Sequence, residues 1–126
     1  MSMTGAQLIE AARQVVGDDI IDQQTWGDDK WLIALNDGLS YLYANYPETR
    51  LDSTGTLYTF ARVTQSALGD SLTLSDMYFS ALVEYLAFRY FDADAGDTRE
   101  SQQATTHWAA FRRLMDPMKM PGSGTR

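Results

Sequence analysis

The residues of this chain that could do chemistry are its acidic side chains and one histidine. Acids cluster in two loop-like stretches, 18–22 and 92–97, where they could suggest a calcium site. A calcium loop of the EF-hand type needs alternating oxygen ligands, a glycine at its bend and a bidentate glutamate at its last position. A loop that begins at Asp92 would end on Gln103, and the first stretch also lacks the spacing. We therefore expect no metal site.

The single histidine, His107, falls on the apolar stripe of a predicted helix. A lone histidine on such a stripe is more often a core or boundary residue than a ligand. The sequence has no cysteine, no second histidine and no residue order typical of a catalytic triad. The glycines form neither a phosphate-binding loop nor a nucleophile elbow. We expect no catalytic residue, no cofactor and no enzymatic activity.

The charges of the chain are unevenly distributed. The 126 residues carry a net charge of −7, and nearly all the excess acid lies before residue 111. Four basic residues and one acid follow, so the C-terminal end could bind an acidic partner or be a solvated terminus. An acidic body argues against binding of duplex DNA, which requires clustered lysine and arginine. The aromatic residues lack interleaved basic residues, so a stacking platform for single strands is not expected either.

The composition predicts one packed domain. Hydrophobic residues make up 44% of the chain, and its length allows a single core. The absence of cysteine excludes disulfides and fits a reducing compartment. The first residues have no basic start followed by an apolar run, so we expect no signal peptide, and no segment is apolar enough to predict a membrane span.

Capping signals delimit the first and last of four predicted helices. Thr4 and the glutamine three residues later form a capping box, and Gly17 is typical of a helix end, which together predict a helix over 5–16. Asp97 is the predicted cap of the last helix, which closes at Asp116 before a proline.

The second predicted helix starts at Thr25 or Asp28, either of which can cap it. It runs to Tyr46, where the following proline ends it. Asn36 and Asp37 fall in the middle of this helix, where their short polar side chains gain nothing from helix propensity. We expect them to bond to a loop or to face a partner.

The third predicted helix, which begins after Ser75 and ends near 93–95, is the one around which the chain is organised. Apolar side chains occupy both of its sides: Phe79, Leu82, Val83, Leu86 and Tyr90 on one, and Met77, Ala81, Phe88 and Phe91 on the other. A helix that is apolar all round is usually buried all round. Either its neighbours wrap it, or its second side meets another subunit.

Residues 47–74 are the least regular part of the chain. Residues 57–60 suit a strand, residues 72–74 could be its partner, and Gly55 marks a turn. The sequence therefore predicts a short β-hairpin or an extended loop. The fold class that follows is mostly α: a four-helix bundle-like domain over residues 1–116, with a flexible C-terminal arm over residues 117–126.

Four stretches of the chain form a layout with a known counterpart. They are W-G-D-D-K-W-L-I-A-L-N-D-G at 26–38, L-T-L-S-D-M-Y-F-S-A-L-V-E-Y-L-A-F-R-Y-F at 72–91, D-A-D-A-G-D at 92–97, and A-x-x-H-W-x-x-F at 104–111. This layout resembles the small helical head–tail connector proteins of tailed bacteriophages, also called adaptor or head-completion proteins. It is a pattern of helices and anchor residues, not a catalytic signature.

The resemblance implies a structural role in the virion neck, at the head–tail interface, after synthesis in the host cytoplasm. Such proteins form a ring, typically a dodecamer, beneath the portal protein of the DNA-filled head. They extend the DNA channel and carry a tail or stopper protein. DNA passes through without sequence-specific binding, and no membrane is involved. An acidic body suits such a channel, because like charge keeps DNA from adhering.

Two sets of residues follow as candidate sites. We expect intersubunit or core packing from Met77, Ala81, Phe88, Trp31 and Leu35. In relatives a terminal arm often reaches into the portal, and here the corresponding residues would be Pro117, Met118, Lys119, Met120, Pro121 and Arg126. An arm that orders only on binding suits stepwise assembly.

A second interpretation needs no virion. The same surplus of apolar helix surface could form a groove for a peptide or a protein in a small helical regulatory or binding module.

Overall fold

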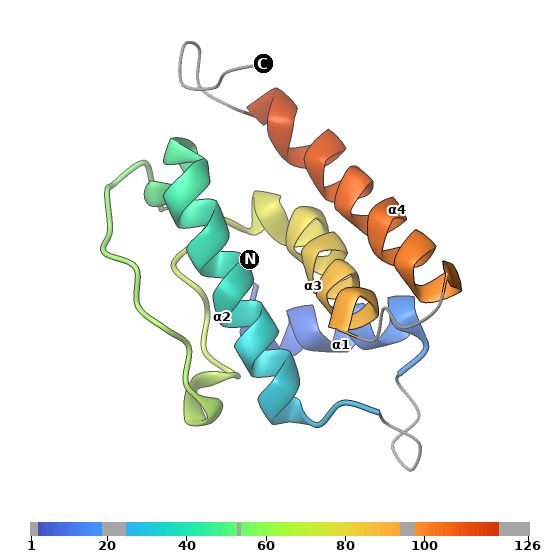
Figure 1. Cartoon of the computed structure of the whole chain (residues 1–126). Helices are drawn as coiled ribbons and strands as arrows, with labels where there is room; N and C mark the ends of the chain where they lie inside the picture. Colours follow the sequence, from blue (N-terminus) through green and yellow to red (C-terminus); the bar gives the residue numbers. More distant parts are fainter. Residues whose placement is uncertain (1–2, 19–24, 53, 94–97, 119–126) are drawn as a thin grey trace.

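A computed structural model describes the whole chain except residues 1–2, 19–24, 53, 94–97 and 119–126 (Figure 1). It is mostly helical, as predicted, with four α-helices in the described residues: α1 (Gly5–Val16), α2 (Asp28–Asn45), α3 (Phe79–Ala93) and α4 (Thr98–Met115). The predicted cap Asp97 and most of the predicted arm lie outside the described residues, including Lys119, Met120, Pro121 and Arg126.

Helix α3 lies at the centre of the fold. It packs against α4, α1 and α2, and α4 lies along it over most of its length (Figure 1). The side chains on both of its sides are buried, with Leu82 and Leu86 on one and Ala81 and Phe91 on the other. Of the two interpretations of the two-sided helix, the structure therefore supports a core helix wrapped by its neighbours.

The first helix has the predicted bounds because both of its ends are set by local hydrogen bonds. Thr4 and Gln7 make the reciprocal bonds of a capping box, and Gly17 adopts a left-handed conformation (φ 81°). The start of α2 differs from the prediction. Its N-cap is Gly27, and no side chain caps it there. Asp28 is the first residue of the helix, and its carboxylate accepts a hydrogen bond from the buried Arg13.

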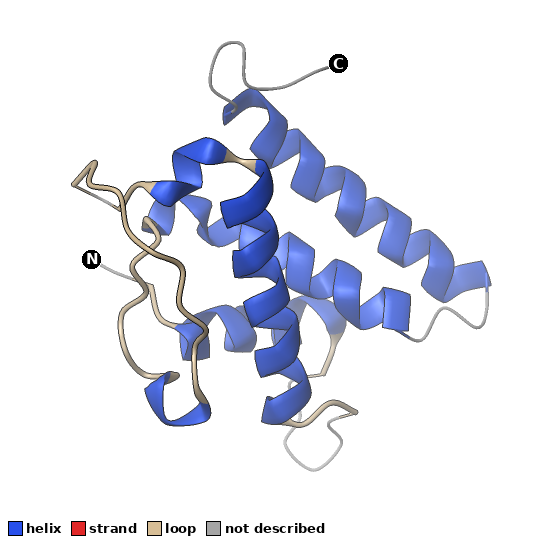
Figure 2. Cartoon of the chain, turned by 60° about the vertical axis from the view of Figure 1, so that its left-hand side comes forward, coloured by secondary structure: helices blue, strands red, loops and turns tan. Residues whose placement is uncertain are grey.

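Between α2 and α3 the chain is extended, and no strand forms in its described residues (Figure 2). Three short 3₁₀ turns, Pro47–Arg50, Gln65–Ala67 and Asp76–Tyr78, interrupt it. Isolated bridges join Leu51 to Leu57 and Asp52 to Leu74, so the predicted pairing of 57–60 with 72–74 does not appear. Of the two predicted alternatives, the extended loop is the one observed.

Side chains of α2 hold this extended segment in place. The Asn36 amide donates to the carbonyl oxygen of Val63 (2.9 Å) and accepts from its N–H (2.7 Å). The Tyr43 hydroxyl donates to the carbonyl oxygen of Tyr58 (3.0 Å). Asn36 is buried, and these bonds satisfy the polar amide that would otherwise be costly there. The expectation that Asn36 binds a loop is confirmed.

Helices α2 and α3 pack closely at Gly38. A methyl group added at Gly38 would lie 2.9 Å from Cδ1 of Tyr85. Tyr85 cannot easily move aside, because its ring packs edge-on against Phe111 (5.6 Å between centroids) and against Trp108 (6.4 Å). The absence of a side chain at Gly38 therefore sets the distance between the two helices.

We expect Gly38→Ala to destabilise the protein by about 1–3 kcal/mol, because the added methyl overpacks the contact with Tyr85. In an unhindered helix the same change would stabilise, by up to about 1 kcal/mol. Urea unfolding measures the difference. Gly69→Ala is the matched control, because no atom lies within 4 Å of its added methyl, and it should change stability by less than about 1 kcal/mol. A Gly38→Ala protein as stable as the wild type would contradict the inferred close packing.

Candidate interaction surface

Three of the five residues expected at a subunit interface lie in the core of the single chain. The exposed fractions are 0% for Trp31, 0% for Leu35 and 2% for Ala81. Trp31 stacks on Tyr90 of α3 with 5.4 Å between ring centroids. These side chains have no surface for a second copy to contact, so of the two expected roles, intersubunit or core packing, the structure assigns them core packing.

The other two expected interface residues differ from each other. Phe88 is half-buried and packs against Trp108 of α4, with 4.9 Å between the ring centroids. Met77, just before α3, is 60% exposed. Met77 is therefore the one member of the predicted set that the fold leaves largely open to a partner.

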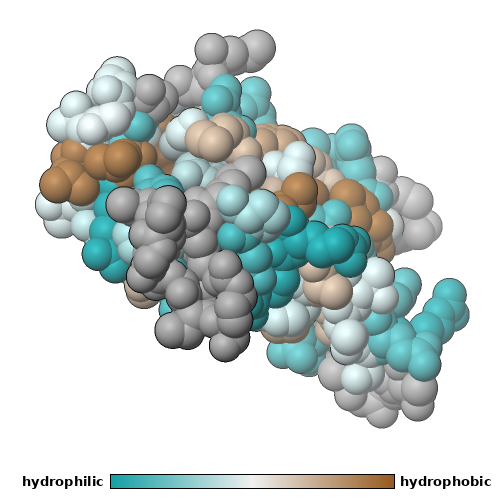
Figure 3. Space-filling model, turned by 90° about the horizontal axis from the view of Figure 1, so that it is seen from above, coloured by the Kyte–Doolittle hydropathy of each residue, from teal (hydrophilic) through white to brown (hydrophobic). Residues whose placement is uncertain are grey.

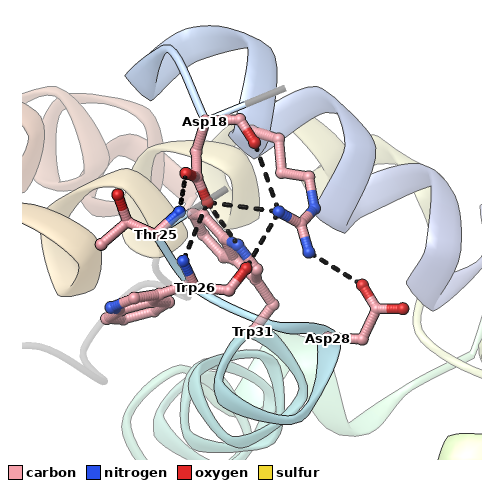
Figure 4. A network of polar contacts seen from close by, with 6 residues as sticks. Asp18, Thr25, Trp26, Asp28 and Trp31 are labelled. Carbon is pink, nitrogen blue, oxygen red and sulfur yellow. Dashed lines mark hydrogen bonds and ion pairs between the residues drawn. The ribbon is translucent and has the colours of Figure 1, made fainter. Parts of the chain in front are cut away.

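A buried polar network that the sequence analysis did not single out lies between α1 and α2 (Figure 4). Arg13 is 3% exposed and Asp18 is 2% exposed, and their side chains form an ion pair at 3.2 Å. The second guanidinium nitrogen of Arg13 pairs with Asp28 at 2.8 Å. The Asp18 carboxylate also accepts from the N–H of Thr25 (2.6 Å) and from the indole N–H of Trp31 (3.4 Å).

This network is structural. Every oxygen of the Asp18 carboxylate has a donor, and Arg13 lies over the Trp31 ring with 5.8 Å to its centroid, so no free group points into a cleft. A signal in the sequence could have found it: Arg13 follows Ile9 by four residues and therefore falls on the apolar face of the first helix. A charged residue at such a position needs a buried partner.

We expect Asp18→Asn to lower the free energy of unfolding by about 3–5 kcal/mol, because it leaves the buried Arg13 charge without its buried counter-charge. Urea unfolding measures the loss. Glu10→Gln, which removes an exposed acid from α1, the helix that carries Arg13, is the control and should change stability by less than about 0.5 kcal/mol. Equal stabilities for the two variants would show that the network contributes little.

His107 has one polar partner and one aromatic partner. Its Nδ1 lies 2.6 Å from Oε1 of Glu84, and its ring stacks on Phe91 with 5.5 Å between centroids. Both partners belong to α3, so His107 joins α4 to the central helix. The prediction of a satisfied boundary histidine is confirmed, and within the described residues no group of histidine and acidic side chains could hold a metal ion.

The root of the predicted C-terminal arm is fixed to the body. A 3₁₀ turn, Asp116–Met118, follows α4 directly. The Asp116 carboxylate accepts from the hydroxyl of Tyr46 (3.1 Å) and from Nε of Arg112 (3.0 Å). Arg112, one of the four basic residues near the C-terminus, therefore already has an acidic partner. Burial, and then the hydrogen bond to Asp116, raise the pKa of Tyr46 to about 12.

This raised pKa predicts loss of stability at alkaline pH. The unfolded chain ionises Tyr46 near pH 10, whereas the folded chain holds the proton to about pH 12, so the stabilisation is present below pH 10 and is lost between these two values. The expected loss is about 2–3 kcal/mol, measured by urea unfolding across that range. Tyr46→Phe should remove this part of the pH dependence. If the variant loses stability as steeply as the wild type, another group is responsible.

Two surface pockets combine exposed apolar side chains with charge. The first, the Glu48 pocket, has a volume of about 460 Å³ and is lined by Glu48, Leu51, Asp52, Gly55, Ser75, Met77 and Tyr78. The carboxylate of Asp52 accepts from Thr54 and Thr56. Glu48 differs, because both of its carboxyl oxygens are buried and neither has a hydrogen-bond donor among the described residues.

The second, the Lys30 pocket, has a volume of about 410 Å³ and is lined by Thr25, Trp26, Lys30, Ile33, Ala34, Arg89 and Ala93. Ile33 is 53% exposed. Arg89 pairs with Asp37 at 2.8 Å, while Lys30 is exposed and forms no ion pair with any described residue. Figure 3 shows hydrophobic side chains reaching the surface in separate patches among polar ones.

No helix in the described residues is long and apolar enough to cross a membrane. No known protein family, no curated protein and no solved structure matches this chain.

Proposed function

We propose that this protein is a structural adaptor of the neck of a tailed bacteriophage. Copies of it form a ring, taken to be a dodecamer, beneath the portal protein, connect the DNA-filled head to the tail and extend the DNA channel. The protein acts without catalysis, and a tail or stopper protein binds on its far side. The basis of the proposal is the resemblance of four stretches of the sequence to head–tail connectors.

The observation that carries the proposal is how these stretches pack. Trp26 and Trp31, from the stretch 26–38, lie against Tyr90, from the stretch 72–91, with ring centroids 5.2 and 5.4 Å apart. His107 and Trp108 of the last stretch pack on Phe91 and Phe88 of the same central helix. Residues that carry the resemblance thus meet around α3, which supports treating them as the anchors of one fold.

The charge distribution also supports the proposal. The body is strongly acidic, with a net charge of −7 for the whole chain. A channel wall of that sign repels DNA phosphates and lets the duplex pass without adhering. The C-terminal arm, in contrast, is basic and begins at the fixed turn around Asp116, from which it would extend to the portal.

One observation favours the alternative of a regulatory or protein-binding module. A pocket of about 230 Å³ lies between α2 and the extended segment, lined mainly by apolar side chains that include Leu39, Phe60, Val63 and Leu72. A peptide side chain could occupy such a pocket.

A tagged pull-down from infected host cells, with the bound proteins identified by mass spectrometry, tests the proposed function. We expect the portal protein and a tail or stopper protein to be captured together. A chain that ends at Met118 is the matched variant: it keeps the described fold and should lose the portal while still capturing further copies of itself. Capture of host cytoplasmic proteins alone would refute the neck role and favour the regulatory module.

A further inference from the structure

The Glu48 pocket and the Lys30 pocket lie at opposite ends of the α2–α3 pair. The two helices are antiparallel (Figure 1), so the Lys30 pocket gathers the start of α2 and the end of α3. The Glu48 pocket gathers the residues just after α2 and just before α3. Helix α2 has 18 residues and is therefore about 27 Å long, with Lys30 in its first turn and Glu48 three residues after its last residue.

The two pockets are complementary in charge. Around the Lys30 pocket, the carboxylates of Asp28 and Asp37 are already paired with Arg13 and Arg89. The carboxylate of Asp29 lies back against Gly27, at the start of the helix. Among the described residues, Lys30 therefore has no ion-pair partner, and it lies on a surface that also presents Ile33.

The Glu48 pocket, in contrast, carries an acid that needs a positively charged partner. A buried carboxyl group without a donor is costly, and buried acids are normally hydrogen-bonded or paired. Glu48 and Tyr78 both line this pocket, and burial, and then the negative charge of Glu48, raise the pKa of Tyr78. Leu51 and Met77 are the exposed apolar residues of the same pocket. A cation carried on an apolar surface is what this pocket lacks.

We propose that copies of this chain associate head to tail, with the Lys30 pocket of one copy docked on the Glu48 pocket of the next. After the Glu48 side chain of one copy changes its rotamer, Lys30 of the neighbouring copy donates to its carboxylate. Ile33 of that neighbouring copy packs against Met77 and Leu51. The inference rests on the proposed function in taking a further copy of the chain as the occupant. Such a contact uses two different surfaces of each copy, and it closes into a ring when the rotation between copies permits.

Two blocking variants test the contact with the full-length protein. Ile33→Asp spoils the Lys30 pocket and Met77→Asp spoils the Glu48 pocket, and both side chains are more than half exposed, so folding should be retained. We expect the wild type to self-associate in sedimentation equilibrium below about 1 mM and each variant to stay monomeric. An equimolar mixture of the two variants keeps one intact contact and should form a one-to-one heterodimer that grows no further.

A charge exchange tests the ion pair itself. Lys30→Glu and Glu48→Lys should each weaken self-association about tenfold or more, and the double variant should recover most of it. Arg113→Glu, which reverses an exposed charge outside both pockets, is the control and should associate like the wild type. Circular dichroism of each variant verifies the fold.

Several results would overturn the inference. They are a wild type that stays monomeric throughout this concentration range, blocking variants that assemble normally, a mixture that forms no heterodimer, and a double variant that recovers no association. These results test the contact between copies, and the neck role can fail independently of them. Association through the two pockets without capture of a portal protein would keep the contact and refute the neck role. If the blocking variants still assemble and still capture the portal protein, the neck role would be kept and the proposed contact refuted.

Discussion

The constraint on which the structure depends is the apolar circumference of α3. A helix without a polar side must be covered from several directions, and a chain of this length has three other helices with which to do it. Helix α4 covers one side, and α1 and α2 cover the others. The cover is close on the α2 side, because the absence of a side chain at Gly38 lets that helix pack against Tyr85.

The Arg13–Asp18 network is the polar counterpart of this core. It joins the end of α1, the chain before α2 and the first turn of α2 around one buried guanidinium. A buried charge tolerates few geometries, because each lost partner leaves an uncompensated ion. Hydrophobic packing alone would hold α1 near α2 in several orientations, and the network favours one of them. Its indole bond to Trp31 couples it to the core itself.

After this packing, six large apolar side chains remain exposed among the described residues, and three of them, Ile33, Leu51 and Met77, line the Lys30 and Glu48 pockets. Ile33 and Met77 stand at opposite ends of the α2–α3 pair, each close to an ionisable group that has no partner among the described residues. An acidic chain with a localised cation at one end of this helix pair, and an acid without a described hydrogen-bond donor at the other, is consistent with the proposed assembly. The neck adaptor is the proposed function, and the head-to-tail contact is the proposed way in which its copies associate.

Features that depend on neighbouring residues could be predicted from the sequence. The bounds of α1 follow from Thr4, Gln7 and Gly17, whose bonds span a few residues, and the helical class follows from hydrophobic periodicity. Tertiary structure decided which apolar residues are left for a partner. Trp31 and Met77 both follow the predicted apolar pattern, yet the packing of Trp26, Tyr90 and Arg13 around Trp31 buries that ring, whereas Met77 stays exposed. Burial depends on contacts between distant residues, so a local pattern cannot assign it.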